Sequence, residues 1–189
     1  DIDPAVGEPA LPASLRQTAS AGPVAGSRTY LVYYGDADPA TTRESILAAG
    51  GSVVGYIPDR TFLVRMAVGG TFTLSTPGGW VGAYQPGYKL SPRLDRAAPA
   101  AAAASVLVFG DADLDAVADA VRAQGLAIVT RSSNGINQLL RVSGTGEQLA
   151  ALAQHPDIAW VEPYVQPQLH NSNAQVVVQT GRNATSRRL

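Results

Sequence analysis

The stretch LVYYGDAD at residues 31–38 decides the fold, because the chain repeats it as VLVFGDAD at residues 106–113. The Gly-Asp-Ala-Asp tetrapeptide is identical in both copies, and Gly35 returns as Gly110, 75 positions later. A short β-prone run that ends at glycine and precedes an aspartate is typical of a strand, a turn and a helix N-cap. The repeat therefore predicts the same strand, turn and helix start twice.

Later matches follow in the same order along the two copies, at offsets of 75, 76, 80 and 81. They pair 63–66 with 139–142, 80–81 with 160–161, Tyr84 with Tyr164, and 85–86 with 166–167. Matches in a constant order at slowly growing offsets indicate a duplication with small insertions and deletions. We therefore expect two copies of one structural unit.

The first helix of each copy has clear end signals. In the first copy Asp38 is expected to be the N-cap, Pro39 the first helical residue, and Gly50 the mark of the C-terminal end. In the second copy Asp113 is the expected cap and Gly125 the expected stop. The same local chemistry thus predicts a helix after each repeated stretch.

Strands and a second helix complete the predicted unit. In the second copy this helix is capped by Thr145 and stopped by Pro156, whereas the matching Thr-rich segment 71–76 of the first copy is expected to form only about one turn. The expected strands are 30–34, 52–57, 61–66 and 80–84 in the first copy, and the repeated stretch, 126–131, 137–142 and 158–165 in the second. Pro58-Asp59 and Asn134-Gly135 are the expected turns between the two middle strands.

The order β-α-β-β-α-β in each copy is that of a ferredoxin-like unit, an antiparallel sheet with its helices on one face. We predict an α+β protein with two such units in tandem. The expected divisions are a flexible lead-in at 1–28, the first unit at 29–94, an Ala/Pro linker at 95–104, the second unit at 105–167, and a tail at 168–189.

Composition narrows the classes of function. The 189 residues contain no cysteine, and His155 and His170 stand far from carboxylates at ligand spacing, so we expect no metal and no cofactor. A net charge of −1 with 15% charged residues gives no electrostatic reason to expect nucleic acid or an anionic membrane as partner. No apolar run approaches the roughly 18 residues of a membrane span.

Groups for catalysis are missing as well. No nucleophile stands with a base and an orienting carboxylate in a recognisable pattern. The Gly-Asp-Ala-Asp segments fit a strand end, a turn and an N-cap better than a metal or acid–base site. The glycine pairs at 69–70 and 78–79 lack the residues of a phosphate-binding loop. We therefore expect a chain without enzymatic activity.

One charged residue interrupts the last strand of the second copy. Glu162 lies within the apolar run 158–165, where the first copy has Gly82. An acid on an exposed sheet face fits either solvated surface or a cap for the helix N-termini of another protein. Trp80 and Trp160, which precede these positions, fit core or sheet-face anchors.

The residues after this strand are expected to form an extended peptide, because Pro163 and Pro167 disfavour helix. This peptide consists of Pro167, Gln168, Leu169 and His170. Asn171 begins a polar segment that a protease would reach readily. Residues 174–188 fit neither repeat and are interpreted as the opening of a further domain.

The string YIPDRTFLVR at 56–65, preceded by AGG at 49–51 and followed by Trp80 and the Gln-Pro at 85–86, resembles the long pro-regions of secreted bacterial subtilisin-like serine proteases. The likeness extends over about residues 30–170, and the tail is similar to the N-terminal stretch of the mature protease ahead of its catalytic Asp motif. The resemblance implies a secreted, non-catalytic propeptide that acts as an intramolecular chaperone and inhibitor. Its partner would be the cognate protease domain.

The resemblance also implies roles for single residues. In this family the propeptide sheet packs on two protease helices, an acid caps those helices, and the C-terminal peptide lies in the substrate cleft. Carried over, Glu162 is the capping acid. The cleft-binding residues are Pro167, Gln168, Leu169 and His170, with cleavage between His170 and Asn171. Because Gly82 replaces the acid in the first copy, the second unit is expected to inhibit and the first to act as a spacer or stabiliser.

Two other hypotheses are also compatible with the sequence. One is a tandem ferredoxin-like module that senses a small ligand between its two units. The other is a free-standing proteinase inhibitor.

Overall fold

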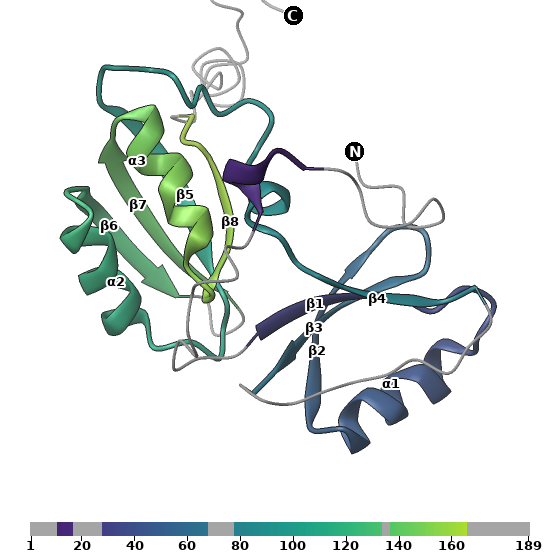
Figure 1. The fold of residues 1–189 in the computed structure, drawn as a ribbon. Coiled ribbons are helices and arrows are strands. Elements are labelled where there is room, and N and C mark those ends of the chain that lie inside the picture. Colours follow the sequence, from purple (N-terminus) through teal and green to yellow (C-terminus); the bar gives the residue numbers. More distant parts are fainter. Residues whose placement is uncertain (1–10, 17–27, 68–77, 134–136, 166–189) are drawn as a thin grey trace, which may run out of the picture.

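The first half of the chain folds as a four-stranded antiparallel sheet with strand order β2-β3-β1-β4 in a computed structural model that describes residues 11–16, 28–67, 78–133 and 137–165 (Figure 1). Its elements are β1 (Arg28–Tyr33), α1 (Pro39–Ala48), β2 (Gly51–Ile57), β3 (Thr61–Met66) and β4 (Trp80–Ala83). The predicted strands are confirmed to within about two residues at their ends. The one-turn helix predicted at 71–76 lies outside the described residues.

The second half forms a second four-stranded antiparallel sheet with the matching order β6-β7-β5-β8. Its elements are β5 (Ala102–Val108), α2 (Leu114–Ala123), β6 (Ala127–Ser133), β7 (Gln138–Gly144), α3 (Gly146–Ala151), a 3-10 turn (Leu152–Gln154) and β8 (Ile158–Pro163). The fold is therefore α+β, as predicted, with the same strand order in both halves. The predicted turn at Asn134-Gly135 lies outside the described residues.

The helix ends form where the sequence predicts them. The Asp38 carboxylate accepts a hydrogen bond from the Thr41 backbone N–H at 2.8 Å, and this bond lowers the pKa of Asp38. Asp113 caps α2 in the same way. Gly50 and Gly125, just beyond the two helices, have φ of +78° and +80°, which only glycine adopts without strain.

A capping box starts α3. The Thr145 hydroxyl accepts from the Gln148 backbone N–H, and the Gln148 side chain accepts in turn from the Thr145 N–H at 2.9 Å. These reciprocal bonds satisfy two backbone donors of a short helix. The cap predicted at Thr145 is confirmed.

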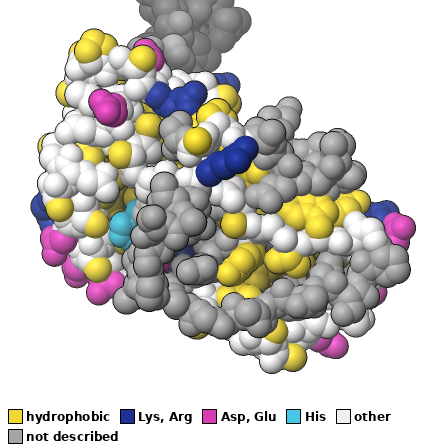
Figure 2. Space-filling model, viewed as in Figure 1, with side chains coloured by type: hydrophobic (Ala, Val, Ile, Leu, Met, Phe, Trp, Pro, Cys, Tyr) yellow, Lys and Arg dark blue, Asp and Glu magenta, His cyan; other side chains and the backbone are white. Residues whose placement is uncertain are grey.

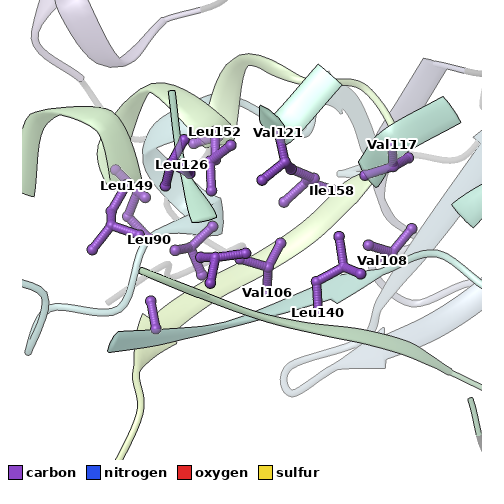
Figure 3. Packing of buried hydrophobic residues seen from close by; sticks show 14 of the residues in the cluster. Leu90, Val106, Val108, Val117, Val121, Leu126, Leu140, Leu149, Leu152 and Ile158 are labelled. Carbon is purple, nitrogen blue, oxygen red and sulfur yellow. The ribbon is translucent and has the colours of Figure 1, made fainter. Parts of the chain in front are cut away.

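The second unit holds the larger core, which lies between its sheet and the helices α2 and α3 (Figure 3). Leu90 and Leu94, from the segment that connects the two sheets, are buried in this core. The Ser91 N–H donates to the Val161 carbonyl at 2.9 Å, so this segment also runs along the outer edge of β8. Residues 90–94 therefore pack with the second unit, whereas the sequence prediction assigned them to the first.

The predicted lead-in and linker also contribute structure. Leu15, in a 3-10 turn (Ala13–Leu15) within the predicted lead-in 1–28, packs against the core of the second unit. The strand β5 begins at Ala102, inside the range 95–104 that the sequence predicts as a linker.

The first unit has a smaller core, which α1 covers alone among the described residues. The buried members of this core are Val32, Tyr34, Ile46, Phe62, Val64 and Met66. Gly51 is needed here because a Cβ at this position would lie 2.9 Å from a methyl carbon of Ile46. The unequal cores make the second unit the more self-sufficient of the two.

The two sheets differ in register by one residue from what the repeat predicts. The sequence match aligns Leu31 with Val106, but Leu31 pairs with Leu63 on the face away from the helix, whereas Val106 pairs with Leu140 in the core. A shift of one residue moves a side chain to the opposite face of a sheet. The offset of 75 therefore holds for the turns and helices and fails for the first strand.

Replacing Leu90 by alanine tests whether the connecting segment belongs to the second core. We expect Leu90→Ala to lower the free energy of unfolding by about 2–4 kcal/mol, since it leaves a cavity in a buried cluster. Leu47→Ala is the matched control, because Leu47 is 57% exposed on α1, and it should cost less than about 0.5 kcal/mol. Urea unfolding followed by Trp160 fluorescence in a Trp80→Phe background measures both, and equal losses would contradict the assignment.

Candidate binding surface

Each sheet has a helix-covered face and an opposite face, which we call the open face. Side chains alternate along a strand, so residues directly paired across strands lie on the same face. Arg65 on β3 pairs with Thr29 on β1, and Arg141 on β7 pairs with Ser105 on β5. Both arginines therefore lie on open faces. They are also counterparts in the sequence repeat.

Arg65 joins the open face of the first sheet to the second unit. Its Nε donates to the Asp111 carboxylate at 2.8 Å, and its Nη2 donates to the Asp157 carboxylate at 2.7 Å. The guanidinium carbon also lies 4.4 Å from the ring centroid of Phe109, and Nη1 donates to the Pro156 carbonyl at 3.3 Å. All these groups lie on two turns of the second unit, before α2 and before β8.

Burial makes this contact energetically important. The Arg65 side chain is 2% exposed, while the side chains of Asp157 and Asp111 are 19% and 45% exposed. A buried guanidinium is tolerated only when its N–H groups are paired, and a carboxylate bonded to it gains more than it would on the surface. This cation is therefore a major contact between the two units.

A second cation lies beside the first. Lys89 is buried, and its Nζ donates to the His155 carbonyl at 2.8 Å, close to the turn that holds Asp157. Burial, with a smaller contribution from the nearby Arg65, lowers the pKa of Lys89 to about 7, and Asp157 opposes the change. Burial also lowers the pKa of His155 below its usual value. The contact therefore favours uncharged Lys89 and His155.

Tyr84 completes the contact between the units. Its hydroxyl lies 3.3 Å from the Ala159 carbonyl of the second unit and 3.3 Å from the Tyr88 carbonyl. Burial raises the pKa of Tyr84 to about 12, so the phenol stays protonated and donates throughout the ordinary pH range.

The open face of the second sheet presents charges without opposite partners among the described residues. Glu162 on β8 is exposed, and its carboxylate accepts from the Trp160 indole N–H at 3.2 Å. The Arg141 guanidinium carbon lies 3.6 Å from the ring centroid of Tyr164. Its Nε is buried and makes no hydrogen bond in the described part of the chain.

The helix-covered side of the second unit contrasts with its open face. Acidic side chains gather over α2 (Figure 2), and two of them are paired with cations. Asp119 pairs with Arg122 at 2.7 Å, and Asp115 pairs with Arg131. Two acids on the helix side are thus paired within the unit, whereas Glu162 and Arg141 on the open face have no oppositely charged partner among the described residues.

The structure places one of the residues predicted for the site. Glu162 lies on the open face of the second sheet, opposite Ser105, and its side chain is exposed. The predicted cleft-binding and cleavage residues lie outside the described residues, so their relation to Glu162 stays a prediction. They are Pro167, Gln168, Leu169, His170 and Asn171.

Sequence reasoning missed the contact between the units. Asp111 was expected to serve only a turn, yet it also binds Arg65. The available signal was the match of Arg65 with Arg141, a charged residue kept at the same place in two otherwise apolar strands. That signal does not identify the carboxylate that Arg65 binds, because Asp157 is far from Arg65 in sequence.

Removing the buried cation should separate or loosen the units. We expect Arg65→Met to lower the free energy of unfolding by about 3 kcal/mol, because Asp157 is left partly buried without its partner. Arg122→Met, which breaks an exposed pair on α2, should cost no more than about 1 kcal/mol. Urea titration of both variants compares them, and a similar small cost for both would show that Arg65 does not hold the units together.

Lys89 should make the free energy of unfolding depend on pH in the alkaline range. Its pKa is about 7 in the folded chain and near 10.5 when unfolded, so the unfolded state binds more protons in between and stability rises with pH. Between pH 8 and 9 this group alone contributes roughly 1 kcal/mol per pH unit. Lys89→Met should flatten the slope, as measured by urea unfolding at several pH values. An unchanged slope would show that Lys89 is not the group whose protonation differs between the folded and unfolded states.

No group of three or more His, Cys, Asp or Glu residues that could hold a metal occurs within the described ranges. None of the described helices is long and apolar enough to span a bilayer. Comparison of the sequence with protein-family models and with curated proteins gives no match to either.

Proposed function

We propose that this chain is the pro-region of a secreted bacterial subtilisin-like serine protease, acting as its intramolecular chaperone and inhibitor. Each half is then a ferredoxin-like unit, the first with a reduced second helix. In this proposal the second unit packs its open face on helices of the protease, Glu162 caps their N-termini, and the peptide 167–170 occupies the substrate cleft. The chain itself carries no catalysis.

The observation that supports this proposal is the difference between the two open faces. On the first sheet Arg65 is buried against Asp111 and Asp157, so that face is already engaged within the chain. On the second sheet Glu162 is exposed at the end of β8, the strand that leads into the proposed cleft peptide. Glu162 has no cation partner among the described residues, and it belongs to the unit that carries both proposed contacts.

Carboxylate chemistry fits the proposed role of Glu162. The N-terminus of a helix presents unpaired backbone N–H groups and a partial positive charge, which a carboxylate satisfies. The Trp160 indole bond leaves the second oxygen of Glu162 and the remaining lone pairs free to accept. A sheet face that presents one oriented acid is suited to the ends of protease helices.

The contact between the units suggests what the first unit does. Arg65 bonds to the turns that precede α2 and β8, and Tyr84 bonds to Ala159 within β8 itself, so both fix the position of the second unit. The second unit has about 60–65 residues and no disulfide, a size at which stability is marginal. The first unit is therefore proposed to brace the second from its edge while leaving the open face clear.

The same contact disfavours the ligand-sensor reading. A module that binds an amino acid between two units needs an unpaired cation there for the ligand carboxylate. Arg65 is the buried guanidinium at that place, and two carboxylates of the chain already occupy it. The pro-region proposal requires no unpaired cation between the units.

Inhibition of a mature subtilisin-like protease tests the proposal. The intact chain should inhibit peptide hydrolysis at micromolar concentration or below, and a chain ending at Val165 should inhibit less because it lacks the cleft peptide. Glu162→Gln should weaken inhibition about 2- to 5-fold, since it removes a charge worth roughly 0.3–1 kcal/mol at a helix N-terminus. Glu147→Gln, an exposed acid in the first turn of α3, is the matched control and should have no effect.

The outcomes separate the possibilities. Absence of inhibition across several mature proteases with extended pro-regions would overturn the proposed function. Inhibition that is equal for the wild type and Glu162→Gln would keep the function and reject the capping role of Glu162.

A further inference from the structure

The contact made by Arg65 has a counterpart that lacks its ligands. Arg65 and Arg141 occupy the same position of the repeated LxR pattern, on the same strand of the unit and on the open face. Each guanidinium lies over an aromatic ring, at 4.4 Å from Phe109 for Arg65 and at 3.6 Å from Tyr164 for Arg141. Arg65 binds two carboxylates, and no described carboxylate binds Arg141.

The unpaired state of Arg141 is costly by itself. Its Nε is buried without a hydrogen-bond partner in the described part of the chain, while Arg65 uses the same atom to bond Asp111. A desolvated N–H of a cation lacks the water that would satisfy it on the surface, so binding an anion gives more than at an exposed site. Stacking on Tyr164 holds the guanidinium plane in place, which reduces the entropy lost on binding.

We infer that Arg141, supported by Tyr164, binds a carboxylate of the protein that docks on the open face of the second sheet. The partner would present an acidic side chain there as the second unit presents Asp111 and Asp157 to Arg65. The identity of that partner rests on the proposed function, whereas the carboxylate receptor rests on the geometry of Arg141.

The position of Glu162 adds a second requirement on the partner. Ser105 pairs with Arg141 on one side and with Glu162 on the other, so the three residues form one row across the sheet. With strands about 4.8 Å apart, the Cα atoms of Arg141 and Glu162 are separated by about 10 Å. Tyr164 holds one side chain and Trp160 the other, and no ion pair forms between them.

The partner surface must therefore place an acid about 10 Å from a group of hydrogen-bond donors. A protease helix whose N-terminus meets Glu162 fits this pattern when an acidic side chain lies roughly two turns along it, or on its neighbour, over Arg141. This arrangement also fixes the direction in which the partner lies, since reversal would bring like charges together.

Inhibition by Arg141 variants tests the inference within the proposed function. Arg141→Gln should weaken inhibition of the mature protease about 10-fold or more, and Arg141→Lys should recover part of it because the charge returns without the planar fork. Arg122→Gln, an exposed arginine on the helix side, should inhibit like the wild type. The urea midpoint of Arg141→Gln should not fall, whereas a drop as large as that of Arg65→Met would show a structural role and overturn the inference.

A second measurement uses the chain alone, so that it does not depend on the protease. In ¹⁵N-labelled wild type, sodium acetate at constant ionic strength should shift the Nε–H resonance of Arg141 saturably, with sodium chloride as control. The Nε–H resonance of Arg65 should not move, since its carboxylates are in place. A saturable shift without any protease inhibition would reject the proposed function and keep the receptor. No selective shift at Arg141 would overturn the receptor, whatever the inhibition result.

Discussion

The burial of one guanidinium is the central polar contact between the two halves of this chain. Arg65 leaves water almost completely, and it does so against two aspartates on different turns of the second unit. Such a contact resists small displacements, because any shift exposes unpaired N–H groups or leaves Asp157 without its cation. Lys89 and Tyr84 bond to the same unit nearby. The open face of the first sheet is thereby engaged, whereas on the second sheet the Arg141 Nε has no hydrogen-bond partner within the described ranges.

Duplication explains both the likeness and the difference of the two faces. An arginine backed by an aromatic ring stands on each sheet. In the first unit this arginine binds the second unit, and in the second unit it has no described ligand. Gly82 and Glu162 match in the sequence repeat but pair differently in the two sheets, Gly82 with Leu31 and Glu162 with Ser105. The open face thus occurs twice in this chain. The first copy contacts the second unit, and the second copy is proposed to bind a protease.

The sequence predicted local structure well, because local structure depends on neighbouring residues. The caps at Asp38, Asp113 and Thr145 follow from turn and cap chemistry. The register of the first strand did not follow, since a one-residue difference in pairing leaves the local pattern unchanged. The partners of Arg65 depend on how two units dock, which no local pattern encodes. Glu162 was predicted because a charge interrupts an apolar strand, whereas nothing in the sequence distinguishes Arg141 from Arg65.

Site-specific photo-crosslinking tests most directly the claim that only the second sheet faces a protease. Leu63 and Leu139 are repeat counterparts on the two open faces. Each lies two residues before the arginine on its strand, and each is half-buried. A photoreactive phenylalanine analogue at position 139 should crosslink to a mature subtilisin-like protease upon illumination, and the same analogue at position 63 should not. Crosslinking from position 63 with none from position 139 would contradict the account.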